Sequence, residues 1–437
     1  MEQLLLFEDD LEQRGLFVME EMVRRENLLK AYSRVKRNGG APGIDGMTVT
    51  ALGEYLRVHW QDIREHLLSG SYQPQPVLRR EIPKPGGGIR KLGIPTALDR
   101  LVQQALMQVL TPIYEPTFSN WSFGFRPGRG TQDAVLQARE YVAQGRRWVV
   151  DIDLERFFDR VNHDVLMARV ARKVKDKRAL RLIRQFLEAG VLEGGLVQPT
   201  IEGTPQGGPL SPLLSNILLD DLDKELEKRG HRFCRYADDA NVYVRTRRAG
   251  ERLMASMTRF LSVKLKLGVN EKKSAVARPW NRQFLGFSMT RDTKPKLRVA
   301  PDREKRFKRG LRPLLRTGRG RSIAESLKRL APIIRGWVGY FKLSDVKAAF
   351  ERLDQWLRRR IRVLYWRHWK RPKTRLREML KRGVSYDRAK KSVGNGRGAW
   401  WNAGASHMNL TIQTKELRSL GLVSFQEEFQ RLKCSTG

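Results

Sequence analysis

Residues 232–244, RFCRYADDANVYV, place two adjacent aspartates between two runs of aromatic and β-branched residues. Such runs favour strands, so the segment predicts a β-hairpin with Asp238 and Asp239 at its turn. Neighbouring carboxylates repel each other, and a bound cation relieves that repulsion. The pattern therefore predicts a protein with a β-sheet that presents a metal-binding turn, in preference to a solvated acidic loop.

A second apolar run supplies candidate partners for this hairpin. Residues 146–158 read RRWVVDIDLERFF, and strand alternation puts Asp151 and Asp153 on the same face, so the residues alone leave both as candidates. The apolar neighbours Val149, Val150 and Ile152 predict a central strand, in which a buried acid needs a partner. Carboxylates that converge from separate strands are what two-metal phosphoryl transfer requires, and Asp holds magnesium at a short distance.

Two further Asp-Asp pairs are expected to be solvated. Asp9 and Asp10 lie in a terminal segment. Asp220 and Asp221 lie on a predicted amphipathic helix over 213–226, where a solvated face explains them.

The net charge of +38, from 85 Lys and Arg against 47 Asp and Glu, predicts a polyanionic partner. Such an excess destabilises a compact chain by self-repulsion, and it exceeds what solubility requires. The excess is concentrated, because residues 301–400 hold 31 Lys and Arg against 8 Asp and Glu. Nucleic acid is the natural partner, and phosphate binding together with aromatic side chains would suit structured RNA.

Cysteine content and hydropathy exclude other classes. Two cysteines, Cys234 and Cys434, allow neither a disulfide framework nor a zinc site of the four-cysteine type, which indicates a reducing interior. The start of the chain, MEQLLLFEDDLEQRG, lacks the basic segment of a signal peptide. No run approaches the roughly 20 apolar residues that span a bilayer. We expect a cytoplasmic protein without a membrane partner.

The coarse pattern alternates helices with short strands. Helices are expected over 20–37, 50–68, 96–112 and 213–226 from their apolar spacing and flanking turn residues. The segment 80–95, REIPKPGGGIRKLGIP, predicts two short strands joined by a glycine turn. At 437 residues, the chain is expected to form two or three domains. Beyond residue 300 the pattern becomes helical and basic.

In their order along the chain, the motifs resemble those of the reverse transcriptases encoded by bacterial group II introns, also called intron maturases. The matching segments are NGGAPGIDG (38–46), IPKPGGGIRKLGIP (82–95), FGFRPGRGTQDA (123–134), DIDLERFFD (151–159), TPQGGPLSPLLSN (204–216), YADD (236–239), LGVNEKKS (267–274), FLGF (284–287) and IIRGWVGYF (333–341). The resemblance runs through nearly the whole chain, which is more specific than any single motif.

The resemblance implies a role for each matching position. Asp153, Asp238 and Asp239 would be catalytic and, together with Leu154, would hold two Mg²⁺ ions, with Mn²⁺ as an alternative. The nucleotide-binding positions are Lys84, Arg90, Phe158, Gln206 and Lys273, of which Phe158 would exclude a ribose 2′ hydroxyl and Lys273 would donate a proton to pyrophosphate. The primer grip would be Phe284, Leu285 and Gly286. The RNA- and template-binding positions are Gly40, Ala41, Pro42, Gly43, Arg126 and Asn216.

The implied fold is α+β, a right-hand polymerase whose fingers and palm carry an antiparallel palm sheet. Residues 1–70 would extend the fingers, 71–297 form fingers and palm, 298–372 a helical thumb (maturase domain X), and 373–437 a small basic DNA-binding domain. The chain resembles compact, class C-like members, and no endonuclease domain is expected.

The implied function is RNA-directed DNA synthesis for a mobile intron. The partners would be intron RNA and template RNA, a DNA primer or target, and deoxynucleoside triphosphates. One alternative is a splicing maturase that only binds RNA, which the intact metal ligands disfavour. A second is a domesticated reverse transcriptase in defence or DNA repair. The oligomeric state stays open.

Overall fold

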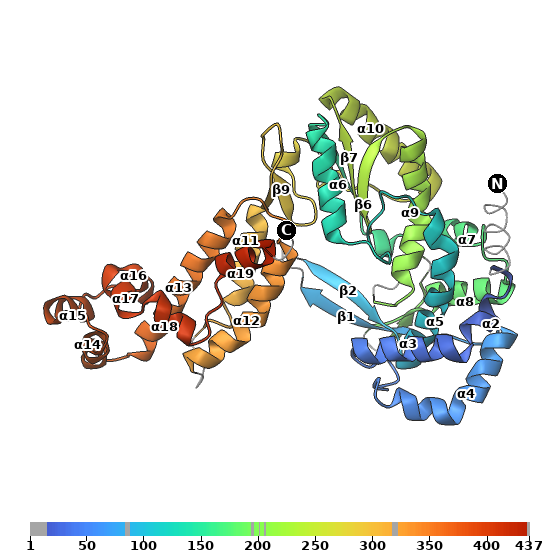
Figure 1. The fold of residues 1–437 in the computed structure, drawn as a ribbon. Coiled ribbons are helices and arrows are strands. Elements are labelled where there is room, and N and C mark those ends of the chain that lie inside the picture. The colour runs from blue at the N-terminus through green and yellow to red at the C-terminus, as the bar shows by residue number, and fades with distance from the viewer. Residues whose placement is uncertain are drawn as a thin grey trace. The chain divides into compact units, whose positions relative to one another are not determined.

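The computed structural model describes residues 15–83, 88–193, 196–200, 202–204, 207–316 and 322–434. Its contacts divide the chain into two compact units, Met1–Pro279 and Trp280–Gly437 (Figure 1). Residues 280–297 therefore pack with the second unit. The division into four domains at residues 70, 297 and 372 stays a prediction.

The first unit mixes helices and strands, as expected. Its helices are α2 (Val18–Met22), α3 (Arg25–Asn38), α4 (Leu52–Ser69), α5 (Ala97–Tyr114), α6 (Thr131–Ala143), α7 (His163–Val170), α8 (Lys177–Glu188), α9 (Ser211–Lys228) and α10 (Arg247–Phe260). Its strands are β1 (Val77–Pro83), β2 (Ile89–Ile94), β3 (Trp148–Asp153), β4 (Val191–Glu193), β5 (Leu196–Gln198), β6 (Arg232–Tyr236), β7 (Asp239–Val244) and β8 (Ala275–Ala277).

The first predicted helix is interrupted. The sequence predicted one helix over 20–37, whereas the structure has α2 and α3 with Arg24 in an extended conformation between them. The side chain of Asn27 donates to the carbonyl of Met22 at 2.9 Å, which satisfies one of the last carbonyls of α2. The sequence prediction missed this break because the residues around it, Asn27 included, also fit a helical pattern.

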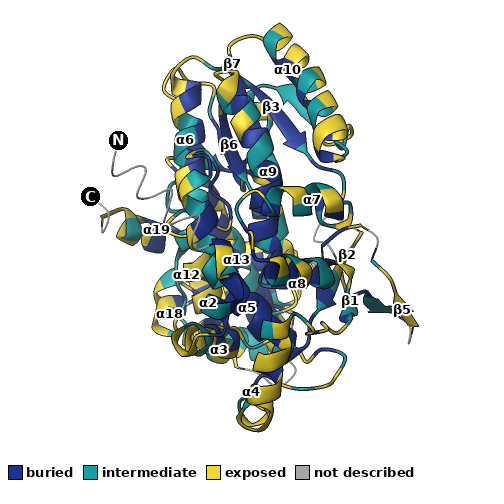
Figure 2. Cartoon of the chain, turned by 90° about the vertical axis from the view of Figure 1, so that its right-hand side faces the viewer, coloured by how far each residue is buried: buried dark blue, intermediate teal, exposed yellow. Residues whose placement is uncertain are grey.

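A four-stranded antiparallel sheet in the order β6-β7-β3-β8 forms the centre of the first unit. Strand β3 has a partner on each side, so its predicted central position is confirmed. Figure 2 shows that β3, β6 and β7 are largely buried, and α6, α9 and α10 contact the sheet. The predicted hairpin at 232–244 is also confirmed, with β6 pairing β7.

A second sheet, in the order β2-β1-β4-β5, contains the two short strands predicted at 80–95, whereas the turn at 84–87 lies outside the described residues. Strands β1 and β2 pair antiparallel from Leu78–Ile94 to Pro83–Ile89, whereas β1 and β4 pair parallel. The outer half of this hairpin is exposed. Exposed strands with charged side chains are suited to contact a ligand more than to build a core.

Helix α9 places Asp220 and Asp221 against protein, which corrects the expectation that both are solvated. Asp221 accepts from Arg169 Nε at 3.0 Å and forms an ion pair with Arg172. Burial raises the pKa of Asp220 from 3.8 to about 6, and the charge of Asp223 adds to that effect. The two acids differ because Arg169 on α7 and Arg172 just after α7 both contact Asp221.

The Asp220→Asn variant is expected to be more stable than the wild type at neutral pH. Because the folded-state pKa is raised, the wild type loses stability as the pH rises from about 4 to about 6, and the variant does not. The difference should reach about 1–3 kcal/mol above pH 6 and vanish near pH 4. Urea denaturation across that pH range measures it. Asp221→Asn is the control, and it should destabilise at neutral pH because it loses two arginine contacts.

The second unit is mainly helical. A hairpin of β9 (Phe287–Met289) and β10 (Leu297–Val299) precedes α11 (Pro301–Leu311), α12 (Ile323–Tyr340), α13 (Ala348–His368), α14 (Pro372–Lys381), α15 (Tyr386–Val393), α16 (Ala399–Gly404), α17 (Ser406–Thr411), α18 (Thr414–Ser419) and α19 (Phe425–Cys434). Trp337 on α12 packs against Phe350 on α13 and Phe425 on α19, with ring centroids 5.8 and 6.0 Å apart. Aromatic side chains therefore form the core between these helices.

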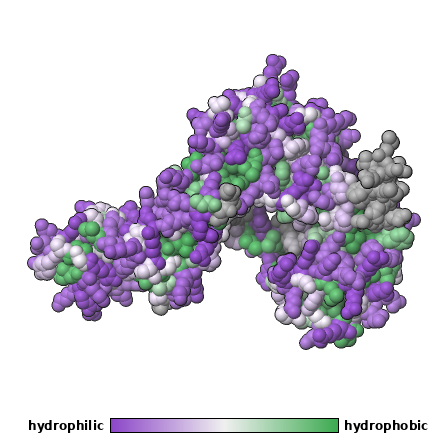
Figure 3. Space-filling model, in the orientation of Figure 1, coloured by the Kyte–Doolittle hydropathy of each residue, from purple (hydrophilic) through white to green (hydrophobic). Residues whose placement is uncertain are grey.

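The face of the molecule seen in Figure 3 is mostly hydrophilic, with apolar areas scattered over it. Within the described ranges, every helix is too short or too polar to cross a lipid bilayer.

Candidate active site

The three residues predicted to bind metal lie at one end of the central sheet. The register of β3 and β7 pairs Asp153 directly with Asp239, and Asp238 is the adjacent turn residue. Directly opposed residues of an antiparallel pair have Cα atoms about 4.5–5.5 Å apart. Asp151 lies two residues away, opposite Asn241. Strand alternation could not distinguish Asp151 from Asp153. The register does, because it places Asp153 beside the turn between β6 and β7.

The electrostatics of Asp238 indicate a site that favours a cation. Burial raises the pKa of the Asp238 carboxyl, and the charge of Asp153 raises it further, while Arg90 and Arg235 oppose this. Ionised carboxylates held close together in a partly dry site are costly unless a positive charge lies between them. Lys273 supplies one such charge, with Nζ 3.5 Å from Asp153 Oδ1.

The donor set suits magnesium in chemistry, since the three carboxylates offer the oxygen ligands that this ion prefers. Across the described residues, however, no three His, Cys, Asp or Glu side chains form a ready-made metal cluster. Backbone register brings the three residues together, and rotation of their side chains would have to complete the site. The side chain of Lys273 would then have to move away from Asp153.

The backbone of Leu154 fits the same site. Leu154 forms an isolated antiparallel bridge with Val269, and the flanking hydrogen bonds use Asp153 O, as acceptor from Asn270 N, and Glu155 N, as donor to Gly268 O. The hydrogen bonds across this bridge thus come from the neighbours of Leu154 and not from Leu154 itself. The carbonyl of Leu154 therefore points away from Val269. That carbonyl is the group that could join the carboxylates as an oxygen ligand.

The turn that presents Asp238 has a strained backbone and is held in place by the buried side chain of Arg235. Ala237 has a φ of +58°, a left-handed conformation that L-residues rarely adopt. Arg235 is 1% exposed and donates from Nη1 to the carbonyl of Ala237 at 2.9 Å. It also makes a bidentate ion pair with buried Asp223, at 2.7 and 2.6 Å, and donates to Asn216 Oδ1 at 3.0 Å. Sequence reasoning missed Arg235, although an arginine between Cys234 and Tyr236 in a strand with apolar residues was a usable signal.

Three of the five predicted nucleotide-binding residues lie in the described part of the chain. Arg90 on β2 is near enough to Asp238 to influence its pKa, and Lys273 pairs with Asp153. Phe158 is half-buried beside buried Phe157, with ring centroids 5.1 Å apart, and its carbonyl accepts from Thr204 N at 2.7 Å. Lys84 and Gln206 lie outside the described residues.

The predicted RNA-binding loop at 40–43 is clamped by a residue that sequence reasoning did not single out. Arg100 on α5 donates to the carbonyls of Gly39 and Ala41, at 3.1 and 3.0 Å. A side chain at Gly40 would meet Arg100, since an added Cβ would lie 2.5 Å from Nη1. Gly40, Ala41 and Pro42 are exposed, and Gly43 is buried against Thr96.

Arg126 and Asn216 use their polar atoms within the protein. Arg126 donates to the carbonyls of Ser119 and Ser122 and forms an ion pair with Glu115 at 2.8 Å. Asn216 is 1% exposed and donates to the carbonyl of Gly124 at 2.8 Å. A template contact at these two positions stays a prediction. Because both side chains bind the protein backbone, they would act on a template indirectly, through the backbone segment that they hold in place.

The predicted primer grip is a tight turn in the second unit. Phe284 and Phe287 exchange two backbone hydrogen bonds of 2.9 Å, and Leu285 and Gly286 both have positive φ, the pattern of a type I′ hairpin. Tyr340 Oη donates to the carbonyl of Leu285 at 2.8 Å, so α12 holds the turn.

Two family models match the chain. Residues 82–289 match "Reverse transcriptase (RNA-dependent DNA polymerase)", and residues 304–383 match "Group II intron, maturase-specific domain". Together they cover more than half of the chain. It belongs to the group II intron reverse transcriptase and maturase family.

Similar proteins occur in several organisms. The chain is 43% identical to Protein YkfC of Escherichia coli K12 over 192 residues, which are 43% of this chain and 50% of that protein. It is 40% identical to the Group II intron-encoded protein LtrA of Lactococcus lactis subsp. cremoris over 204 residues, 46% of this chain and 34% of LtrA. This family member thus spans half of YkfC and about a third of LtrA.

Among solved structures, a chain of a "Partial Cas6-RT-Cas1--Cas2 complex" is similar to this family member. The TM-score is 0.37 and the identity 24%, over 56% of this chain and 42% of the other.

Proposed function

We propose that this protein is an RNA-directed DNA polymerase of a group II intron. The observation that carries the proposal is the register that sets Asp153 opposite Asp239, with Asp238 beside them, at the end of a central strand. The reaction is attack of a primer 3′ hydroxyl on the α-phosphorus of a deoxynucleoside triphosphate, with RNA as template and pyrophosphate as leaving group. The matched reverse transcriptase family supports this assignment.

Two magnesium ions, or manganese ions in their place, would be held by Asp153, Asp238, Asp239 and the carbonyl of Leu154. When bound, they supply charge stabilisation of the transferring phosphoryl group and a more acidic 3′ hydroxyl. Arg90 lies on the finger hairpin and offers charge-assisted hydrogen bonds to a triphosphate. Lys273 is close to the carboxylates, where it can donate a proton to departing pyrophosphate.

The finer architecture follows the same proposal. The antiparallel sheet β6-β7-β3-β8 would be the palm, the β1-β2 hairpin the fingers, and the helices after residue 297 the thumb, followed by a basic DNA-binding region. The maturase-specific match at 304–383 supports binding of intron RNA for splicing and retrohoming. The strong positive charge is consistent with both nucleic-acid partners.

Primer extension on an RNA template with magnesium tests the function. We expect extension with deoxynucleotides that stops when the divalent ions are chelated. Lack of extension on RNA and DNA templates, by a folded protein that binds the primer-template, would contradict the proposal and favour the splicing-only alternative.

Phe158→Ala is expected to relax discrimination against ribonucleotides by roughly 10–100-fold, since the half-buried ring would no longer exclude a 2′ hydroxyl. Competing incorporation of ribonucleotides and deoxynucleotides opposite the same template base measures the effect. Phe157→Leu is the matched control. It should lower stability, because Phe157 is 3% exposed, and leave the discrimination unchanged. Unchanged discrimination in Phe158→Ala would place the sugar gate elsewhere.

A further inference from the structure

A buried histidine links the start of α7 to a segment 40 residues further along the chain. His163, the first residue of α7, is 3% exposed, and its Nε2 lies 2.6 Å from the carbonyl oxygen of Gly203. A carbonyl oxygen can only accept, so Nε2 carries the proton and donates the hydrogen bond. His163 lies outside every segment in which the sequence predicted a site residue.

The segment that His163 holds is packed on the backbone of the predicted sugar gate, Phe158. The amide of Thr204 donates to the carbonyl of Phe158 at 2.7 Å, and the amide of Gly203 donates to the carbonyl of Val161 at 2.8 Å. Gly203 has a φ of +95°, and an added Cβ would lie 2.9 Å from the carbonyl oxygen of Phe158. A shift of this segment would therefore change the surroundings of Phe158 directly.

The same loop is anchored a second time at Gly207 and Gly208. An added Cβ on Gly207 would lie 2.6 Å from the carbonyl oxygen of Gly93 on β2, and one on Gly208 would lie 2.3 Å from Oε1 of Gln103 on α5. In the sequence, the predicted nucleotide-binding residue Gln206 stands between the two anchored stretches. His163 thus holds the stretch that leads to Gln206.

The contact of His163 does more than fill the core. An apolar side chain would fill the same space, whereas a hydrogen bond to a backbone carbonyl is directional and fixes the place of Gly203. A buried carbonyl that loses its donor favours a conformation in which water reaches it. Without the imidazole, the segment would therefore move away from the backbone of Phe158.

We propose that His163 is a positioning residue for nucleotide selection. Its hydrogen bond to Gly203 holds the segment before Gln206 against the backbone of Phe158, and so keeps the sugar gate in place. This inference rests on the proposed polymerase function, because it takes Phe158 and Gln206 to contact the incoming nucleotide. His163 acts through Gly203 and not by contact with the nucleotide.

His163→Leu is expected to raise the KM for deoxynucleotides roughly tenfold and to reduce discrimination against ribonucleotides by a similar factor. The kcat should stay within about threefold, because the loss concerns nucleotide binding more than the chemical step. Steady-state primer extension with each nucleotide measures these quantities. His163→Gln should recover most of both losses, since its side-chain amide offers a donor near the position of Nε2.

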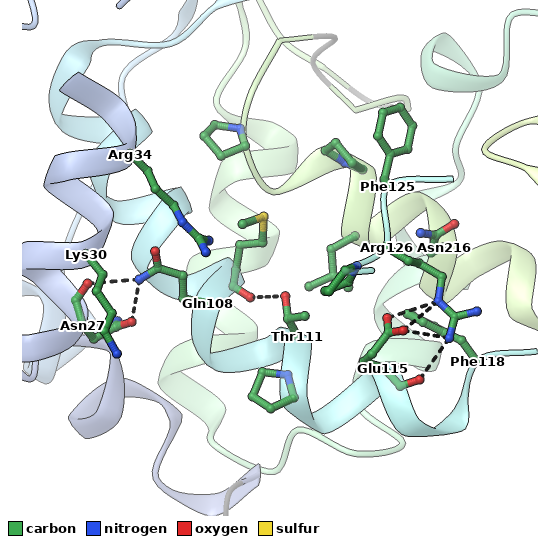
Figure 4. Close-up of a pocket in the computed structure, with 16 residues that line it drawn as sticks. Asn27, Lys30, Arg34, Gln108, Thr111, Glu115, Phe118, Phe125, Arg126 and Asn216 are labelled. Carbon is green, nitrogen blue, oxygen red and sulfur yellow. Dashed lines mark hydrogen bonds and ion pairs between the residues drawn. The ribbon is translucent and has the colours of Figure 1, made fainter. Parts of the chain in front are cut away.

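Tyr114→Phe is the matched control. Tyr114 is 4% exposed, and its Oη donates to the carbonyl of Val170, at the other end of α7, also at 2.6 Å. The variant loses a buried bond of the same kind and length, so it should lower stability while the KM and the discrimination stay unchanged. Neither Tyr114 nor His163 is among the described residues that line the cavity of about 780 Å³ between α3, α5 and α9 (Figure 4). A difference between the two variants would therefore not come from that cavity.

Amide hydrogen exchange tests the contact without nucleotide or turnover. His163→Leu should speed the exchange of the Gly203 and Thr204 amides at least tenfold, and Tyr114→Phe should not. If His163→Leu fails to fold, Gly203→Ala disturbs the same contact, because its Cβ would crowd the carbonyl of Phe158. It should then raise the KM and relax the discrimination as expected for His163→Leu.

The results separate the role of His163 from the polymerase assignment. If the wild type extends primers and a folded His163→Leu variant keeps the KM and the discrimination, the polymerase assignment stands and the inference is overturned. Equal effects in His163→Leu and Tyr114→Phe would also overturn it, as would failure of His163→Gln to recover any activity. If the wild type extends no primer, the polymerase assignment fails and the role in nucleotide selection fails with it, whatever the exchange of Gly203 shows.

Discussion

Asp238→Ala is expected to reduce primer extension at least a thousandfold while nucleic-acid affinity stays within about twofold. A metal ion that stabilises transition-state charge contributes several kcal/mol, and each 1.36 kcal/mol changes the rate tenfold. The Asp238 carboxylate does not attract phosphates, so binding of the nucleic acid should not depend on it. Single-turnover extension and equilibrium binding of the same primer–template measure the two quantities.

Loss of folding would not explain that result. Burial raises the pKa of Asp238, which means that its ionised form is disfavoured in the folded chain, so removal of the charge should not lower the melting temperature. Asp153→Ala and Asp239→Ala should behave alike. Asp164→Ala is the control, since this carboxyl pairs with Arg184 away from the site, and it should keep full activity. Activity retained in Asp238→Ala would remove the metal assignment.

The sequence was sufficient for the elements that carry a strong local pattern. The hairpin at 232–244 has apolar strands around a polar turn, and α5 begins where Thr96 accepts from Asp99 N at 3.0 Å, a cap that is visible in the sequence. The central position of β3 followed from its apolar residues Val149, Val150 and Ile152. What alternation could not decide was the choice between Asp151 and Asp153, because it depends on the register with a strand that begins 86 residues later.

Residues with internal partners were harder to interpret. Arg126 and Asn216 stand in motifs that resemble functional segments, yet their partners include the backbone carbonyls of Ser119, Ser122 and Gly124, and a backbone carbonyl leaves no signal in a sequence. Asp220 was expected in solvent because a helical pattern shows that a position faces away from one core. It does not show that another part of the protein, here the segment at Ser119, covers that face.

Arg235→Ala is expected to destabilise the protein by about 3–5 kcal/mol. The change leaves Asp223, which is 0% exposed, as an unpaired buried charge, and the carbonyl of Ala237 loses its donor. Arg235→Lys should recover part of the loss, because one ammonium cannot reproduce the bidentate pair. Chemical denaturation measures both. A loss below about 1 kcal/mol would mean that the buried pair is not the anchor that its geometry indicates.

Arg235 also has a role that stability alone would not reveal, and a double variant separates the two. Replacing a buried ion pair by apolar residues of similar volume is often neutral for stability, so Arg235→Met/Asp223→Leu should recover most of the lost free energy of unfolding. The carbonyl of Ala237, whose left-handed conformation presents Asp238, would then lose the hydrogen bond from Arg235. We therefore expect a double variant that is folded and binds primer–template, but extends it at least tenfold more slowly and requires more magnesium for half-maximal rate. Wild-type extension at wild-type magnesium demand would limit the network to holding the fold.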